Sequence, residues 1–245
     1  MGIFDDLAAE QERLEKILAG LDEGQWRSAS GAEGWTIADV VLHLAQSEEA
    51  VEATVAHRYP DSGLGVAAGD TMDERAAEAV RAERAAPAEV LGRWRRAREA
   101  GLAALRATDP DQPLRWVAGT MKPATLATTR LAEHWAHGLD IVGPLGVEFP
   151  DTDRLRHVAW LAHRTLPYAL SLAGEPAAPV RCELTAPDGA EVWRFGPADA
   201  ESAITGAAGE FCRVAAQRLD PAQTGLQVSG PHGAAALRLV RTYAA

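Results

Sequence analysis

The chain has 245 residues, of which 47% are hydrophobic and 24% are charged, and this balance is ordinary for a globular protein. Its net charge of -11 opposes the binding of nucleic acid, because such binding depends on neutralising phosphate groups. The sequence also lacks an apolar run near the ~20 residues that a membrane span needs, so we expect neither a nucleic-acid partner nor a membrane segment.

The N-terminus and the cysteines favour a cytoplasmic protein. Asp5 and Asp6 stand where a secretion signal needs basic residues, so we expect a cytoplasmic location. Cys182 and Cys212 are far apart in the sequence and form no CxxC pattern. In a reducing compartment we expect both thiols to be buried, reduced and chemically inert.

Helical signals begin near the N-terminus. Apolar residues recur at helical spacing over residues 3 to 21, and Gly20 predicts an end close by. Thr36 followed by Asp39 resembles a capping box, which predicts a second helix that runs to about residue 58.

Proline and glycine divide the next part of the chain. We expect a loop over residues 64 to 70, followed by a helical stretch over residues 72 to 107 with a break or kink at Pro87. Pro123 suits the first turn of a fourth helix, and Gly143-Pro144 predicts the end of that helix.

The sequence changes character at about residue 150, where we expect a domain boundary. The helices before it, joined by short to medium connections, predict a four-helix bundle over residues 1 to 150. Strand-like runs appear only after it. Residues 151 to 245 are therefore predicted to form a small α+β domain, and the whole chain an α+β protein.

The second domain mixes predicted helices and strands. In chain order they are a helix over residues 152 to 172, strands over 180 to 184 and 191 to 195, a helix over 200 to 219, a strand over 226 to 229 and a terminal helix. Ala186-Pro187-Asp188-Gly189 joins the first two strands and is typical of a hairpin turn.

Three residues from two predicted helices form the strongest candidate site. Glu133 and His137 are four residues apart on one helix, so their side chains share a face and one ion could bridge them. His43 could supply a third ligand and leave one coordination position open, as catalytic metal sites do. The alternatives are a Glu133 to His137 hydrogen bond or an ion pair of Glu133 with Arg130 on the helix surface, and a purely structural His43. His134 could also join His137 in holding an ion.

Several motifs make the chain similar to a known family. The motif Gly34-Trp35-Thr36 leading to His43-Leu44, and the motif Glu133-x-x-x-His137 within Trp135-Ala136-His137-Gly138-Leu139-Asp140, resemble the DinB-like metal-binding superfamily. Within it the chain is most similar to the actinobacterial branch that contains mycothiol-dependent maleylpyruvate isomerase. Three later stretches resemble that branch more weakly: Trp193-Arg194-Phe195-Gly196-Pro197, Ile204-Thr205-Gly206 and Gln217-Arg218. The resemblance implies a DinB-like four-helix bundle followed by a sterol-carrier-like α+β domain.

The resemblance also implies a cofactor set. Carried over residue by residue, it makes His43, Glu133 and His137 the metal ligands and favours Glu133 over His134. Two imidazoles and one carboxylate suit Zn²⁺ best, although Ni²⁺, Mn²⁺ and Fe²⁺ accept the same donors. The implied co-substrate is mycothiol or a similar low-molecular-weight thiol. His134 departs from the family pattern, in which a small or apolar residue is expected.

These features predict a divalent-metal-dependent enzyme that activates a thiol for attack on a small electrophilic substrate. Addition, rotation and elimination would make it an isomerase, and addition without release would make it an S-transferase. Two alternatives stay open. One is a thiol-independent, metal-assisted tailoring enzyme of secondary metabolism that hydrolyses, eliminates or cyclises, and the other is a non-catalytic protein that binds a small ligand. We expect a monomer or a homodimer.

Four further residues are candidates for roles in the site. Arg130, one helical turn before the ligand carboxylate, is predicted to be a catalytic residue that binds a substrate carboxylate, or else to form an ion pair on its own helix. His134 is the second candidate catalytic residue. Trp35 is expected to line the cofactor pocket, or else to be a packed core tryptophan. Asp39 either orients His43 or only caps its helix.

Overall fold

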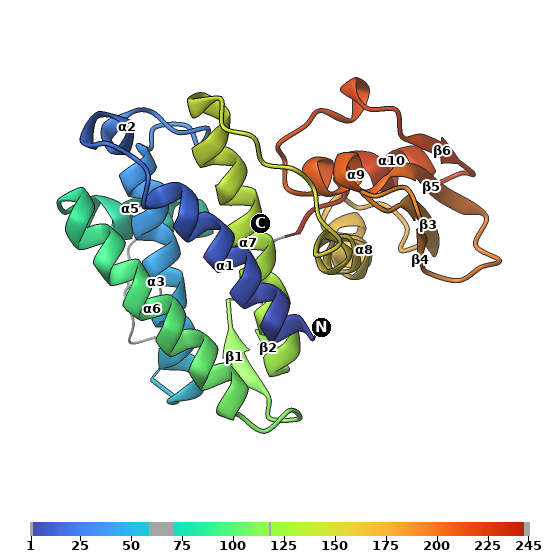
Figure 1. Cartoon of the computed structure of the whole chain (residues 1–245). Coiled ribbons are helices and arrows are strands. Elements are labelled where there is room, and N and C mark those ends of the chain that lie inside the picture. The colour runs from blue at the N-terminus through green and yellow to red at the C-terminus, as the bar shows by residue number, and fades with distance from the viewer. Residues whose placement is uncertain (1, 59–70, 118, 243–245) are drawn as a thin grey trace. The chain divides into compact units, whose positions relative to one another are not determined.

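The computed structural model describes residues 2 to 58, 71 to 117 and 119 to 242. Over these residues the chain forms two compact units, of which the first ends at Phe149 and the second begins at Pro150. The first unit is helical apart from a small hairpin, and the second joins helices to a sheet (Figure 1). The predicted α+β class, with a helical part followed by a mixed part, is confirmed.

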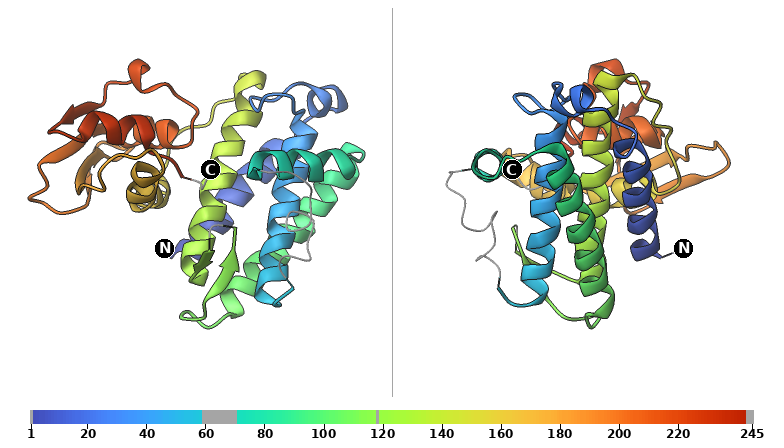
Figure 2. Two further views of the ribbon diagram at one scale, coloured as in Figure 1. Left: turned by 180° about the vertical axis from the view of Figure 1, so that it is seen from behind. Right: turned by 60° about the vertical axis from the view of Figure 1, so that its left-hand side comes forward.

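Among the described residues of the first unit, four long helices run side by side as the predicted bundle (Figure 2). They are α1 (Ile3–Leu18), α3 (Ile37–Val55), α6 (Pro87–Ala107) and α7 (Pro123–Leu145). α3 packs against α6 and α7, and α1 packs against α7. The core between them is apolar and contains the buried rings of Trp94 and Trp135.

Smaller elements complete the described part of this unit. They are the short helices α2 (Glu23–Arg27) and α5 (Met72–Ala82), and the antiparallel hairpin of β1 (Leu114–Trp116) and β2 (Gly119–Met121). α2, β1 and β2 were not among the predicted elements, because each is too short to show a periodic pattern. The loop predicted over residues 64 to 70 lies outside the described residues.

Local sequence signals set where the bundle helices begin. The predicted capping box is present, since the N–H of Asp39 donates to Thr36 Oγ1 at 3.2 Å and the N–H of Thr36 donates to Asp39 Oδ2 at 3.0 Å. Pro87 and Pro123 take the first positions of α6 and α7, where a missing N–H costs no helical hydrogen bond. Pro87 thereby separates α5 from α6, as predicted.

The predicted end of α7 at Gly143-Pro144 is wrong, because the helix continues to Leu145 and ends at Gly146 with a φ of 63°. Pro144 has no N–H to donate to the carbonyl of Asp140, four residues earlier. That carbonyl instead accepts a hydrogen bond of 2.7 Å from the N–H of Gly31. A neighbouring loop thus supplies the donor that the proline lacks.

The second unit is built on a sheet with the strand order β4-β3-β5-β6. The strands are β3 (Val180–Thr185), β4 (Val192–Phe195), β5 (Ser202–Ala207) and β6 (Gln227–Ser229). β3 pairs antiparallel with β4 through the predicted hairpin and parallel with β5, whose other neighbour is the antiparallel β6. Three helices pack on the sheet: α8 (Leu155–Leu172), α9 (Ala208–Ala215) and α10 (Gly233–Leu239).

The helix predicted over residues 200 to 219 is wrong in its first half. Ser202–Ala207 form the inner strand β5, and only Ala208–Ala215 are helical. Ala203 and Ile204 are buried between β3 and β6, so pairing on both sides decides their state. Ala and Gly are depleted in strands, so in a segment where they surround Ile204 and Thr205 the tertiary context decides the outcome.

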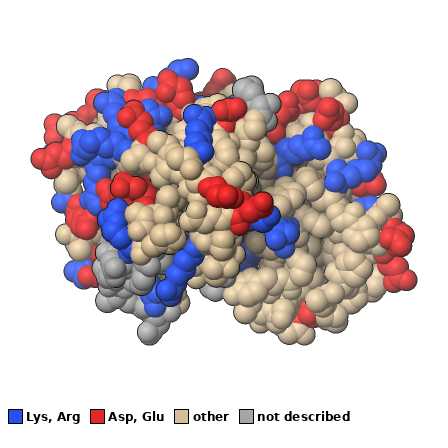
Figure 3. Space-filling view, turned by 90° about the horizontal axis from the view of Figure 1, so that it is seen from below, with Lys and Arg blue, Asp and Glu red and all other residues tan. Residues whose placement is uncertain are grey.

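Two predictions about cysteine and charge can be compared with the structure. Cys182 and Cys212 are free and buried, and burial raises the pKa of the Cys182 thiol to about 12. Figure 3 shows basic and acidic side chains intermingled over the helical unit on the face it draws. Of the helices that the structure describes, none is long and apolar enough to cross a membrane.

The packing of Gly138 gives a test of the bundle. A Cβ added at Gly138 would lie 2.7 Å from Cζ of Phe149, whose ring also carries the guanidinium of Arg13 at 3.4 Å from its centroid. We expect Gly138→Ala to lower the free energy of unfolding by about 1 to 3 kcal/mol, because overpacking outweighs the gain in helix propensity. Urea denaturation measures this change.

Gly92→Ala in α6 is the matched control. A Cβ there would meet only the Nη1 atom of Arg96, at 3.4 Å, and that atom ends a long side chain that can move away. We expect this variant to gain up to ~1 kcal/mol of stability from helix propensity. Equal stabilisation by both substitutions would contradict the packing of Phe149.

Candidate metal centre

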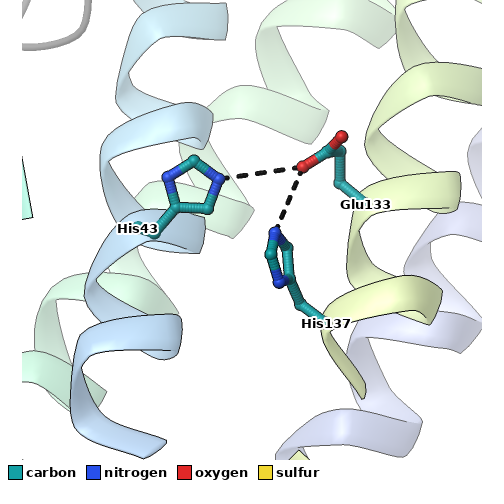
Figure 4. Close-up of side chains that lie close together, drawn as sticks. All are labelled: His43, Glu133 and His137. Carbon is teal, nitrogen blue, oxygen red and sulfur yellow. Dashed lines mark ion pairs between the residues drawn. The ribbon is translucent and has the colours of Figure 1, made fainter. Parts of the chain in front are cut away.

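The three predicted ligands come together between two bundle helices. His43 lies on α3, and Glu133 and His137 lie one turn apart on α7 (Figure 4). The helical period places Glu133 and His137 on one face of α7, and the packing of α3 on α7 brings His43 opposite them. One ligand atom from each residue lies within 4.8 Å of the other two.

The distances in this cluster fit a shared ion. Glu133 Oε2 lies 3.4 Å from His137 Nε2 and 3.7 Å from His43 Nε2. Both separations are long for hydrogen bonds. In a tetrahedral site with bonds of about 2.0 to 2.1 Å, neighbouring ligand atoms are about 3.3 Å apart. The two separations are close to that spacing.

The site is partly open on one side and walled by a ring on another. The side chains of His43 and His137 are 12% and 13% exposed, whereas that of Glu133 is 29% exposed. Trp35 lies against both histidines, with ring centroids 5.2 Å from His43 and 6.4 Å from His137. Trp35 therefore lies beside the cluster, and it also packs against the apolar core of the bundle.

The charges in the cluster are strongly coupled. Burial by itself raises the pKa of Glu133, but the neighbouring imidazoles of His137 and His43 hold it well below its usual range. Burial lowers the pKa of His43. Burial also acts to lower the pKa of His137, but the carboxylates of Asp140 and Glu133 outweigh it and raise that pKa. The cluster therefore favours an ionised Glu133, which a cation can share.

Asp140 belongs to the site and was not predicted. Its Oδ2 atom lies 2.9 Å from His137 Nδ1, and its side chain is 2% exposed. An ionised Asp140 accepts the Nδ1–H, so that the Nε2 lone pair of His137 faces the cluster, as in many metal sites. The spacing of three residues on one helix was the available sequence signal.

Asp39 does not orient His43. Its carboxylate accepts from the Thr36 N–H at the start of α3 and binds Arg84, with Oδ1 2.8 Å from Arg84 Nε. The Nδ1 atom of His43 is buried and has no hydrogen-bond partner. Of the two roles predicted for Asp39, the structure contains the helix cap.

Arg130 pairs with a residue that sequence reasoning did not consider. Its Nε donates to Glu48 Oε1 at 3.0 Å, and its side chain is 4% exposed. The predicted alternative of a surface ion pair with Glu133 is therefore not what the structure contains. The guanidinium instead lies inside the bundle, one turn from Glu133.

His134 is held by hydrogen bonds in the core. Its Nδ1–H donates to the carbonyl of Arg130 at 2.9 Å, and its Nε2 accepts from Trp94 Nε1 at 3.2 Å. The residue is completely buried. Both ring nitrogens are used, so this arrangement offers neither to an ion or a substrate, in place of the catalytic role that we expected.

Known proteins similar to this chain point to one family. The family model described as the mycothiol maleylpyruvate isomerase N-terminal domain matches residues 7–142. An uncharacterized protein of Mycobacterium tuberculosis, found in two strains, is 36% identical over 219 residues, which cover 87% of this chain and 84% of the relative.

Two crystal structures share the fold over most of the chain. They are those of mycothiol-dependent maleylpyruvate isomerase and of a mutant in which alanine replaces a histidine. Each gives a TM-score of 0.62 and covers 93% of this chain and 91% of its own, at 18% and 17% identity respectively. At that identity the likeness establishes the fold.

The buried His134 predicts an acid sensitivity. Burial, followed by the charge of Arg130, lowers the pKa of His134 from 6.5 to about 3. Between these two values the unfolded chain binds one proton more than the folded chain. This contribution to stability is complete above about pH 6.5 and declines by up to about 1.4 kcal/mol per pH unit as the pH falls.

We therefore expect His134→Gln to lose less stability than the wild type between about pH 7 and pH 5. Urea denaturation in the presence of a metal chelator measures the two slopes. Gln retains an acceptor for the Trp94 N–H, which limits the loss at neutral pH. Parallel slopes in the two proteins would show that His134 is not held neutral in the fold.

Asp140 and Asp39 form a matched pair for a second test. We expect Asp140→Asn to weaken Zn²⁺ binding about tenfold, because His137 loses a charged acceptor. Asp39 is similarly buried, at 4% exposure, but binds Arg84 and gives no hydrogen bond to His43 Nδ1, so Asp39→Asn should reduce stability without changing the Kd for Zn²⁺. Competition with a chromogenic chelator measures both Kd values. An unchanged Kd in Asp140→Asn, or an equal loss in both variants, contradicts the assignment of Asp140.

Proposed function

The chain belongs to the family of the mycothiol maleylpyruvate isomerase N-terminal domain, and on that basis we propose that it is a divalent-metal-dependent enzyme that uses a low-molecular-weight thiol. The thiol is mycothiol or a close chemical relative. The thiol attacks a small electrophilic substrate. The observation that carries this proposal is the convergence of His43, Glu133 and His137 on one point.

The donor set supports a divalent cation. Two imidazole nitrogens and one carboxylate oxygen are the ligands that Zn²⁺ accepts in catalytic sites, with a fourth position left for water or substrate. Asp140 holds the Nδ1–H of His137, so the Nε2 atom remains free to bind the ion. We propose Zn²⁺ first, and Ni²⁺, Mn²⁺ or Fe²⁺ as ions that the same donors accept.

The thiol has to come from outside the chain. The two cysteines of the sequence are buried in the second unit, and burial raises the pKa of each thiol. A free thiol has a pKa of about 8.5, so only a few per cent of it is nucleophilic at neutral pH. A divalent cation held by His43, Glu133 and His137 would supply Lewis acidity, which favours deprotonation of a thiol.

The residues of the site position the two reactants. Trp35 covers one side of the cluster and offers its ring to the organic part of the thiol or of the substrate. Glu133 is the most exposed of the three ligands, so the side on which it lies is the natural approach for the electrophile.

The reaction favoured by the family is an isomerisation. The sulfur forms a bond with one carbon of an activated alkene, and the electron pair moves onto the conjugated carbonyl group. The former double bond then rotates, and elimination restores the alkene and releases the thiol. Atoms and electrons balance without an oxidant. If the adduct is instead protonated and released, the same site acts as an S-transferase.

Metal content and thiol dependence together test the proposal. We expect wild-type protein, prepared with sufficient metal, to contain about one divalent ion per chain by elemental analysis, and the His43→Ala/His137→Ala variant to contain none. The matched control is His57→Asn, an exposed histidine in a left-handed backbone position that Asn tolerates. This control should retain the metal and the activity.

The activity is followed by the absorbance of maleylpyruvate and of other activated alkenes, with and without mycothiol. Turnover that requires both the metal and the thiol supports the proposal. Turnover without a thiol identifies a metal-assisted tailoring enzyme instead. Wild-type protein without stoichiometric metal, or full activity in the double variant, defeats the metal-dependent reaction. Absence of both the metal and any turnover favours a binding protein.

A further inference from the structure

Near the candidate metal site, the bundle contains a buried acid that the proposed reaction does not use. Glu48 on α3 is completely buried, and its Oε1 atom accepts from Arg130 Nε at 3.0 Å. Gly101 on α6 leaves room for this carboxylate, because a Cβ at that position would lie 2.9 Å from Glu48 Oε2. Three bundle helices thus accommodate the pair of Glu48 and Arg130.

This ion pair is not arranged for the strongest binding. Nη2 of Arg130 and Oε2 of Glu48 are both buried and have no hydrogen-bond partner, so the two groups share one hydrogen bond instead of two. A buried ion pair of this kind adds little to stability by itself, because removing two charges from water is costly. Stability alone therefore does not explain why the bundle contains this ion pair.

The position of Arg130 gives such a reason. It lies three residues before Glu133 on the same face of α7 and brings a positively charged guanidinium there. An uncompensated positive charge this close, and screened little by solvent, would oppose a divalent cation at Glu133. Glu48 is the carboxylate in contact with that guanidinium.

Burial raises the pKa of Glu48, and the guanidinium of Arg130 opposes that rise and favours the ionised carboxylate. With Glu48 ionised by this contact, the charges around the site balance. Glu48, Glu133 and Asp140 bring three carboxylates and Arg130 brings one guanidinium, which leaves two negative charges in excess. One divalent cation neutralises them. Without Glu48 the excess would fall to a single negative charge, and the field at the site would be less favourable to the ion.

We propose that Glu48 is a positioning residue of the metal centre, which fixes Arg130 and cancels its charge so that a divalent cation can bind at Glu133. This inference rests on the proposed metal site but assigns a role to a residue that contacts neither the ion nor the substrate. A charge-compensating pair differs from an ordinary core ion pair in one respect. Removing Glu48 should weaken metal binding, whereas removing Arg130 should not.

The test compares the Kd for Zn²⁺ in four proteins by competition with a chromogenic chelator, with thermal melts recorded in parallel. Glu48→Gln, which leaves the guanidinium unpaired, should bind Zn²⁺ at least about tenfold more weakly than the wild type. Arg130→Met removes the positive charge and should bind Zn²⁺ as tightly as the wild type or more tightly. The Glu48→Gln/Arg130→Met variant should return to within about threefold of the wild-type Kd.

Each result decides the matter. A purely structural role predicts that every variant loses affinity in step with its melting temperature, and that the double variant does not recover, which overturns the proposal. An unchanged Kd in Glu48→Gln also overturns it. If Glu48→Gln does not fold, Arg130→Met and the double variant still decide, because a tenfold weaker Kd in either contradicts charge compensation. Absence of Zn²⁺ binding by the wild type would instead refute the proposed function itself.

Discussion

Charged side chains that face the inside of a helix bundle must be neutralised there, and this constraint governs the contact between α3 and α7. The charged side chains at this contact form two layers. In one, His43 meets Glu133 and His137, whose ring is held from behind by Asp140. In the next, Glu48 meets the guanidinium of Arg130. The first layer leaves a place that a cation fits. In the second layer the two opposite charges pair with each other.

The two layers explain why neighbouring residues on α7 behave so differently. Glu133 faces α3 at the open end of the cluster and retains exposed surface, whereas the adjacent His134 faces Trp94 and has none. A turn of 100° between successive helical positions separates a candidate ligand from a core residue. The helix α7 therefore carries both core residues and candidate ligands. The helices packed against it determine which of its faces is buried in the core and which faces the site.

Much of the fold follows from local signals. The capping box at Thr36, the prolines at the starts of α6 and α7, and the hairpin between β3 and β4 were all read correctly from the sequence. The errors occur where distant segments intervene. Pro144 stays inside α7 because Gly31 supplies the missing donor, and Ser202–Ala207 form a strand because neighbours pair on both sides. No local pattern contains either interaction.

The sequence by itself determined that Glu133 and His137 share a face, because helical spacing alone fixes that relation, and the resemblance of motifs added His43. Only the tertiary structure decided the roles that depend on other segments of the chain: Asp39 binds Arg84, Arg130 pairs with Glu48, and His134 meets Trp94 in the core. The physical reason is that periodicity fixes which residues lie together on one helix. The packing of one helix against another fixes what each of those residues meets.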